Sequence, residues 1–256
     1  MSTLNLALVQ TQLIWEQVEE NHQHLGELLD QVEGSTDLAI LPEMFATGFS
    51  MNSRAVAEPM DGSSVSWLVE QAQKRGYGMC GSLAICDGDE VYNRFILAGD
   101  SALHTYDKRH LFRMGGEHKR YNGGEQREII DYRGWRILPQ VCYDLRFPVW
   151  SRNQDDYDLA IYVANWPAPR AYHWRQLLIA RAIENQAYVV GVNRVGRDGN
   201  NLDYAGDSLV VGPRGEILLD MNPLNSVQAC EIELQRLQDY REEFPAHMDA
   251  DDFTLG

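Results

Sequence analysis

Short apolar runs alternate with longer amphipathic segments along most of the chain. The short runs favour extended strands, are bounded by turn residues, and cover Leu4–Val9, Leu38–Leu41, Met79–Ile85, Tyr92–Ala98, Ala102–Tyr106, Arg136–Val141, Leu159–Val163, Tyr188–Asn193, Ser208–Val211, Glu216–Leu219 and Val227–Ile232. The longer segments have the spacing of helices and cover Ile14–Val32, Ser64–Arg75, Trp174–Gln186 and Glu233–Arg241. Strands interleaved with helices predict an α/β sandwich rather than an all-helical or all-strand fold.

One domain accounts for the whole chain. Its 256 residues are enough for one large buried core, and 44% of them are apolar. The sequence contains no linker, internal repeat or low-complexity tract that would mark a second unit. We therefore predict one domain over residues 1–256, with residues 242–256 as an acidic C-terminal extension that is either solvated or docked on a partner.

The charge balance excludes several kinds of partner. The net charge is −16 at pH 7, and so negative a surface repels nucleic-acid phosphates and anionic lipids. We therefore expect neither a nucleic-acid nor a membrane partner. In addition, no run of about 20 apolar residues predicts a membrane span. The four cysteines form no C-x-x-C pair and the first residues lack a secretory signal, so we expect a cytoplasmic protein.

Three reactive side chains, Glu43, Lys108 and Cys142, each follow a predicted strand. Ligands of α/β sheets bind outside the C-terminal ends of strands, so we expect the three to converge. A cysteine attacks a carbonyl as its thiolate, which Lys108 would favour. Lys108 and backbone N–H groups after Cys142 would then stabilise the oxyanion. Glu43 would take the thiol proton, protonate the leaving amine and later activate water.

Each of these residues also has an explanation without catalysis. A cysteine at a strand end is commonly a small buried hydrophobic residue. A lysine at such a position is commonly solvated. A glutamate after a Leu-Pro pair can cap a helix. The three positions alone therefore do not decide between a hydrolase and a structural role.

The segments around these residues resemble motifs of a known family. Leu41–Phe49 (LPEMFATGF) is similar to the glutamate motif of the nitrilase superfamily, Tyr106–Phe112 (YDKRHLF) to its lysine motif, and Val141–Pro148 (VCYDLRFP) to its cysteine motif. The three occur in the family's order, and the similarity continues through Ala164–Arg170 (ANWPAPR) and Arg181–Gly196 (RAIENQAYVVGVNRVG). Because it extends over nearly the whole chain, the joint match is far more specific than any single residue.

The resemblance implies a nitrilase-type αββα sandwich whose protomers pair across a helical layer into a homodimer. It also implies no metal and no organic cofactor. Matched position by position, the family's base falls on Glu43, its lysine on Lys108 and its nucleophile on Cys142. Many members have a second glutamate near the site, for which Glu117 is the better match and Glu125 the weaker one. A solvated loop acid is the alternative reading of Glu117.

Within the family, Cys142–Asn153 and Asn165–Arg170 are most similar to the omega-amidases. These enzymes hydrolyse the terminal amide of 2-oxoglutaramate or 2-oxosuccinamate to the 2-oxo acid and ammonia. The nearest alternatives are an N-carbamoyl-amine hydrolase or a nitrilase on the same scaffold. A non-catalytic relative that uses the fold for binding is a further alternative, which an intact trio disfavours.

A 2-oxo acid amide carries a free carboxylate, which calls for a guanidinium near the pocket. The sequence offers four candidates without ranking them, namely Arg113, Arg146, Arg170 and Arg175. Arg146 has an alternative role, bracing the loop beneath Cys142 through an ion pair. Tyr143 and Trp166 lie beside matched segments and are candidates for the pocket wall, with core packing as the alternative for Trp166.

Overall fold

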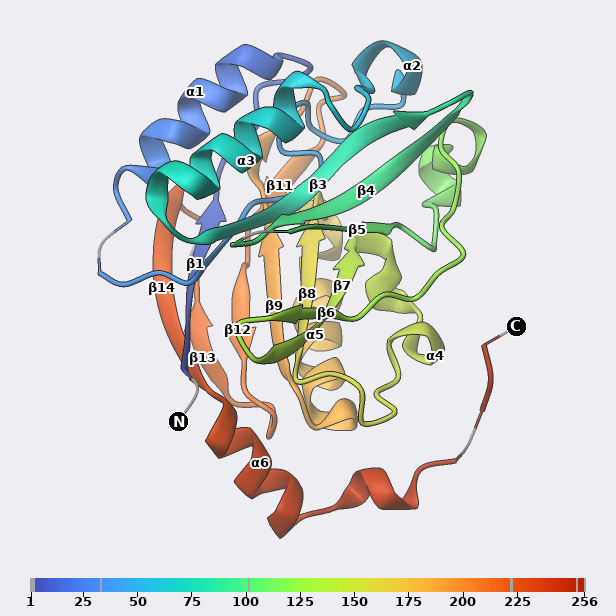
Figure 1. Cartoon of the computed structure of the whole chain (residues 1–256). Coiled ribbons are helices and arrows are strands. Elements are labelled where there is room, and N and C mark those ends of the chain that lie inside the picture. Colours follow the sequence, from blue (N-terminus) through green and yellow to red (C-terminus); the bar gives the residue numbers. More distant parts are fainter. Residues whose placement is uncertain (1–2, 33, 101, 222, 252, 256) are drawn as a thin grey trace.

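The computed structural model describes residues 3–32, 34–100, 102–221, 223–251 and 253–255. In these ranges two six-stranded sheets lie face to face, and helices cover the outer side of each sheet (Figure 1). This arrangement is a single-domain αββα sandwich, so the predicted fold is confirmed.

The first sheet has the strand order β14-β1-β2-β3-β4-β5. Its strands are β1 (Thr3–Gln10), β2 (Leu38–Ile40), β3 (Gly78–Asp87), β4 (Glu90–Ala98), β5 (Leu103–Asp107) and β14 (Ser226–Glu233). β1, β2 and β3 are parallel, whereas β4 is antiparallel to both β3 and β5. β2 and β5 therefore run in the same direction, and their C-terminal ends lie at the same edge of the sheet.

The second sheet has the order β13-β12-β9-β8-β7-β6. Its strands are β6 (Ile130–Tyr132), β7 (Trp135–Val141), β8 (Leu159–Ala164), β9 (Tyr188–Asn193), β12 (Leu209–Val211) and β13 (Ile217–Asp220). β7, β8 and β9 are parallel at the centre of this sheet. The segments that follow these three strands consequently emerge at one edge.

Alternation along the strands divides the core into layers. On β1, Leu4, Leu6 and Leu8 belong to the large apolar cluster between the sheets, whereas Ala7 and Val9 belong to the cluster under the outer helices. Successive side chains of a strand point to opposite faces, so one strand supplies both layers. The outer helices on this side are α1 (Val18–Leu29) and α3 (Ser63–Arg75).

The helix α5 (Ala171–Asn185) covers the outer face of the second sheet (Figure 1). It packs closely on β9 because Gly191 has no side chain. A Cβ atom at this position would lie 2.5 Å from Leu178 and 2.7 Å from Trp174 of the helix. Any larger residue at position 191 would therefore push the helix away from the sheet.

Most predicted elements are present, with three notable differences. The first helix begins at Val18 rather than Ile14, because Glu16 has a φ of 54°, which does not fit a helix. The hairpin β10 (Val195–Arg197) and β11 (Asp203–Ala205) and the short strand β6 were not predicted. The remaining short elements are α2 (Ser53–Val56), α4 (Pro148–Ser151), η1 (Arg113–Gly115), η2 (Glu117–Lys119), η3 (Cys142–Arg146), η4 (Ala168–Arg170) and η5 (Ala246–Asp249).

The C-terminal segment packs against its own chain. The helix α6 (Leu234–Glu243) contains the predicted boundary at residue 242, and Gln186 Nε2 donates to the carbonyl of Phe244 just beyond it, at 2.6 Å. Leu255 packs against the main apolar cluster. Asp252 and Gly256 of the predicted extension lie outside the described residues. None of the described helices combines the length and apolar character that crossing a bilayer requires.

Candidate active site

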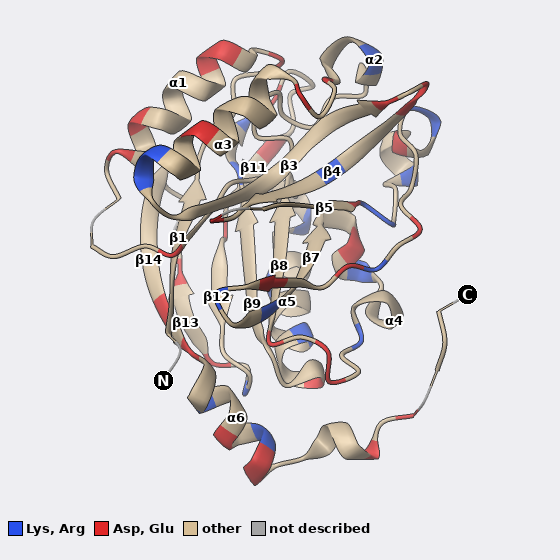
Figure 2. Cartoon of the chain, in the orientation of Figure 1, with Lys and Arg blue, Asp and Glu red and all other residues tan. Residues whose placement is uncertain are grey.

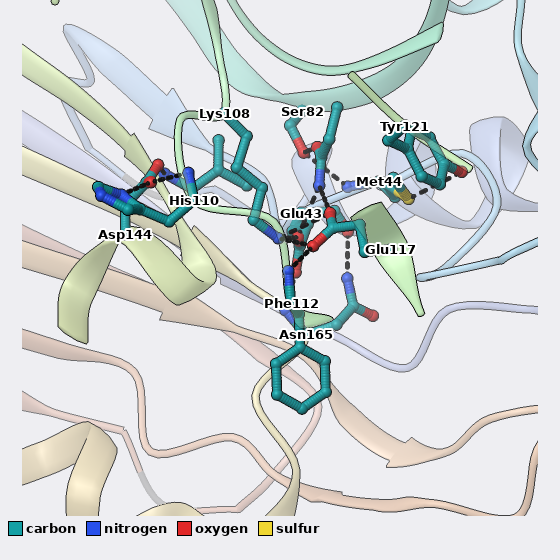
Figure 3. Close-up of polar contacts among 12 residues, drawn as sticks. Glu43, Met44, Ser82, Lys108, His110, Phe112, Glu117, Tyr121, Asp144 and Asn165 are labelled. Carbon is teal, nitrogen blue, oxygen red and sulfur yellow. Dashed lines mark hydrogen bonds and ion pairs between the residues drawn. The ribbon is translucent and has the colours of Figure 1, made fainter. Parts of the chain in front are cut away.

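The structure brings Glu43, Lys108 and Cys142 together in one buried cluster. Glu43 follows β2 and Lys108 follows β5, at the same edge of the first sheet, and their polar atoms meet at 3.1 Å (Figure 3). Cys142 follows β7 of the facing sheet, and its thiol interacts with both partners. The three side chains thus come from both sheets and meet between them.

Glu43 is fully buried and holds its carboxylate with several hydrogen bonds. Oε1 accepts from Asn93 Nδ2 at 2.7 Å and from Lys108 Nζ at 3.1 Å. Oε2 accepts from the backbone N–H of Asn165 at 2.7 Å. These donors fix the orientation of the Glu43 carboxylate, as a positioned proton acceptor requires.

Lys108 is also buried and lies between two carboxylates. Its Nζ contacts Glu117 Oε1 at 2.9 Å and Oε2 at 3.0 Å, in addition to Glu43. Burial alone would lower the pKa of Lys108, but the charges of Glu117 and Glu43 outweigh it and raise that pKa above its ordinary value. The ammonium therefore stays charged at neutral pH.

The better of the two candidate second glutamates, Glu117, lies inside the cluster. It is fully buried, and its carboxylate also accepts from the backbone N–H of Phe112. Burial and the charge of Glu43 raise its pKa, against the opposing effect of Lys108. The preceding Gly116 has a φ of +78°, which turns the chain so that Glu117 faces inward. Glu125 is exposed and takes no part in the cluster.

Cys142 begins the 3₁₀ segment η3 with a φ of +46°, an uncommon value for a residue with a side chain. Burial, followed by the charge of Glu43, raises the pKa of its thiol, and Lys108 opposes this only in part. We expected Lys108 to favour the thiolate, and its effect has that sign but does not prevail. The resting side chain is therefore a thiol, which needs a base before it can attack.

Asp144 fixes the loop that carries Cys142. This buried carboxylate accepts from the backbone N–H of Val141 at 3.1 Å, from the backbone N–H of His110 at 2.9 Å and from the hydroxyl of Tyr106 at 2.9 Å. Figure 3 shows the same carboxylate against the ring of His110, at 2.8 Å from Nδ1. It thus joins the cysteine loop to the segment that carries Lys108.

A cavity of about 380 Å³ opens onto Cys142 and Lys108. This is a common size for a small-molecule site. Tyr143 and Trp166 both line it, as predicted for the pocket wall. Trp166 packs on Trp174 as well, with ring centres 5.5 Å apart, so it lies both in the cavity wall and against a core residue.

The four candidate arginines have different positions. Arg146 and Arg170 line the cavity, with their guanidinium groups over the rings of Trp166 and Phe112. Arg113 is exposed and does not belong to the described lining. Arg175 forms ion pairs with acids outside the cavity, Asp207 and Asp220.

Arg146 does not brace the loop beneath Cys142 through an ion pair, which was its alternative role. Arg146 forms no ion pair with any acid that the structure describes, and its Nη2 contacts His173 Nδ1 at 3.1 Å. Arg181 of α5 supports the loop instead, donating to the carbonyl of Leu145 at 2.7 Å. The guanidinium of Arg146 is therefore available to a ligand in the cavity.

Comparison with known proteins identifies the family. A model of the carbon-nitrogen hydrolase family matches residues 5–242, nearly the entire chain. The chain belongs to the carbon-nitrogen hydrolase family. It is accordingly a hydrolase that acts on carbon–nitrogen bonds other than peptide bonds. The predicted membership of the nitrilase superfamily and the predicted class of enzyme are both confirmed.

Two relatives of this carbon-nitrogen hydrolase have names that state an activity. Omega-amidase YafV of Yersinia enterocolitica is 51% identical to it over the full length of both chains. The 2-oxoglutaramate amidase of Bacillus subtilis is 33% identical, over 90% of this chain and 91% of the relative.

Solved structures of relatives have the same fold. XC1258 from Xanthomonas campestris, a CN-hydrolase superfamily protein with an arsenic adduct in its active site, superposes with a TM-score of 0.97 at 46% identity over 100% of both chains. Saccharomyces cerevisiae Nit3, a member of branch 10 of the nitrilase superfamily, gives a TM-score of 0.86 at 26% identity over 95% of this chain and 94% of Nit3.

Several polar residues of this hydrolase's site were not predicted from its sequence. Asn93 Nδ2, from β4, donates to Glu43, and the side-chain oxygen Oδ1 of Asn93 accepts from the hydroxyl of Ser82 at 2.8 Å. Asn165 lies in a segment that resembles the family, and that resemblance was the one feature of the sequence that could have indicated its place in the site.

Among the described residues no group of three or more His, Cys, Asp or Glu side chains is arranged to hold a metal ion.

Proposed function

We propose that this hydrolase is an omega-amidase, which converts the terminal amide of 2-oxoglutaramate or 2-oxosuccinamate to the 2-oxo acid and ammonia through a thioester on Cys142. The names of the relatives at 51% and 33% identity support this substrate class. The observation that carries the proposal is a buried carboxylate–ammonium–thiol cluster at a cavity lined by two guanidinium groups that form no ion pair with any acid in the described residues.

The first half of the reaction forms the thioester. Glu43 takes the proton of the Cys142 thiol, and the sulfur attacks the amide carbon. The ammonium of Lys108 stabilises the negative charge that develops on the amide oxygen. This attraction between opposite charges is strong because the site is buried. When the carbon–nitrogen bond breaks, Glu43 returns the proton to the leaving nitrogen, and ammonia departs.

The second half of the reaction removes the acyl group. Glu43, ionised again, accepts a proton from a water molecule that attacks the thioester carbon. The carbon–sulfur bond breaks, Glu43 returns that proton to the sulfur of Cys142, and the 2-oxo acid leaves. Glu117 contacts Lys108 rather than Cys142 or Glu43, so we assign it a positioning role.

Arg146 and Arg170 are the candidates for binding the far carboxylate of the substrate. Burial lowers the pKa of Arg146, and the neighbouring charge of Arg170 lowers it further. Two like charges side by side in a cavity attract an anionic group that relieves their repulsion. Both rest on aromatic rings, which orients their planes.

A comparison of substrates tests the assignment. We expect 2-oxoglutaramate to be hydrolysed with a kcat/KM roughly 100-fold or more above that of an N-carbamoyl amine or a nitrile of similar size, because only the oxo-amide matches both the thiol chemistry and the guanidinium pair. Ammonia release measured for all three compounds checks this. A preference for the carbamoyl compound or the nitrile would replace the proposal by that activity.

Removing one guanidinium should mainly weaken substrate binding. We expect Arg146→Gln or Arg170→Gln to raise KM for 2-oxoglutaramate by about 10- to 100-fold, since a charge-assisted hydrogen bond contributes about 1.5–3 kcal/mol. Activity on an uncharged aliphatic amide should change little. Arg113→Gln, an exposed neighbour, is the matched control. Equal KM values in the two cavity variants and the control would exclude both arginines as the carboxylate site.

We further propose that the protein is a cytoplasmic homodimer. The outer layer formed by α5 exposes two large apolar side chains, with Tyr172 73% and Ile183 50% accessible. Exposed apolar side chains on a helical layer are typical of a surface that a second protomer covers. Sedimentation of the purified protein at the mass of one chain would contradict the dimer.

A further inference from the structure

A second cavity, of about 720 Å³, lies beside the segment that carries Glu117. Its lining comes from α2 and the residues before it, from the tip of the β3–β4 hairpin, and from residues 118–122. Figure 2 shows Lys and Arg on α2 and on the loop beside that hairpin tip. Met51 lines both this cavity and the one at Cys142, so the two are neighbours.

Three cations line this second cavity, which we call the basic cavity. Arg54, Lys119 and Arg120 are exposed and form no ion pair with any acid in the part of the chain that the structure describes. Asp89 is the one acidic residue in the described lining. Burial lowers the pKa of His118 in the same lining, and the positive charges of Arg113 and Lys119 lower it further. The cavity therefore has an excess of positive charge.

This excess is unusual for the molecule. The chain has 38 acidic residues against 22 Lys and Arg, and many arginines elsewhere on its surface are paired, for example Arg133 with both Asp37 and Asp100. In this acidic chain the basic cavity thus places three cations beside a single acidic residue, and none of the three forms an ion pair with a described acid. Unpaired cations in a concave site focus a positive potential and repel one another until an anion binds.

We propose that the basic cavity binds a small, multiply charged oxyanion, of the phosphate or polycarboxylate class, between Arg54 of α2, Lys119 of η2 and Arg120, which follows η2. The guanidinium groups supply the paired donors that such oxygens accept. This site is separate from the amide-hydrolysing cluster, and the inference does not rest on the substrate that we assign to that cluster.

A bound anion would brace the segment that positions Glu117. The backbone N–H groups of Arg120 and Tyr121 both donate to the carbonyl of Glu117 at 2.9 Å. The hydroxyl of Ser53, next to Arg54, donates to the carbonyl of Arg120 at 2.8 Å. An anion held by Arg54 and Arg120 would add a second link between the same two segments, directly behind the glutamate that contacts Lys108.

Thermal unfolding with added anions tests the inference. We expect inorganic pyrophosphate or citrate at saturation to raise Tm of the native protein by about 3 °C or more, because a ligand that binds only the folded state stabilises it. NaCl at matched ionic strength should not. Stabilisation by only one of the two anions identifies the phosphate or the polycarboxylate class, and stabilisation by neither overturns the inference.

Variants locate the binding. The Arg54→Gln/Arg120→Gln double variant should lose the shift, whereas Lys74→Gln, an exposed lysine on α3, should keep it. The Arg146→Gln/Arg170→Gln double variant should also keep it, and a loss there would place the anion in the substrate cavity and refute the proposal. As a second readout, amide exchange at Arg120 and Tyr121 should slow with anion in the native protein. Unchanged exchange at both positions would refute the proposed brace.

Discussion

Cys142→Ala is expected to lower kcat/KM for 2-oxoglutaramate by at least about 10⁴-fold while the protein remains folded. Loss of a nucleophile removes the covalent route, and nucleophile deletions in other hydrolases cost up to about 10⁶-fold. Alanine retains the backbone and the Cβ atom at the φ of +46° and deletes only one sulfur, so the loop should keep its shape. Steady-state ammonia release and circular dichroism measure the two effects.

Cys86→Ala is the control for this change, since Cys86 is a free thiol on β3 outside the cluster. It should retain near-normal activity. Mass spectrometry of the native enzyme, quenched during turnover, should find the acyl group on the peptide that contains Cys142. Activity of Cys142→Ala within about 10-fold of the native rate would rule out the thioester mechanism.

Glu43→Gln is expected to lower kcat by about 10³-fold. General acid–base catalysis contributes about 10²- to 10⁴-fold, and this carboxylate is assigned every proton transfer in both half-reactions. Glutamine has nearly the same volume, and its carbonyl oxygen can still accept from Asn93 or Lys108. The loss should therefore appear in turnover rather than in folding, which thermal unfolding of the variant can verify.

In Glu43→Gln we also expect one reaction to become faster, namely the alkylation of the Cys142 thiol. The charge of Glu43 raises the pKa of the Cys142 thiol, so its removal should lower that pKa and leave Lys108 less opposed. At a fixed pH near 8, below the thiol pKa, the thiolate fraction and hence the rate of alkylation by iodoacetamide should rise. Glu125→Gln, an exposed control, should change neither rate. Slower alkylation together with unaltered turnover would show that Glu43 is not the base.

Much of the fold was predictable because its determinants are local. The short apolar runs predicted β1, β3 and β4 nearly to their ends, since a strand that lies between two apolar layers must be apolar on both faces. The meeting of Glu43 with Lys108 followed from their positions after strands that run in the same direction. The confirmed parts therefore depend on periodicity and on strand direction.

The unpredicted parts depend on contacts between distant segments. Asp144 binds Tyr106, which is 38 residues away, and Asn165 binds Glu43 across 122 residues. Nothing beside these residues in the sequence reveals such partners. The four candidate arginines could not be ranked because the direction of each side chain depends on how its segment packs on the rest of the fold. Turn geometry decides the left-handed backbone conformation of Glu16, and α1 therefore begins later than predicted.

The position of the Lys108 ammonium between two glutamates also affects how the product would leave the site. An uncharged amide group enters the cluster, whereas hydrolysis leaves a new anion beside Glu43 and Glu117, whose joint charge Lys108 offsets only in part. Like charges at close range in a buried site repel strongly. On the proposed pathway the finished acid is therefore expelled by the groups that made it, which disfavours the reverse reaction and keeps inhibition by product weak.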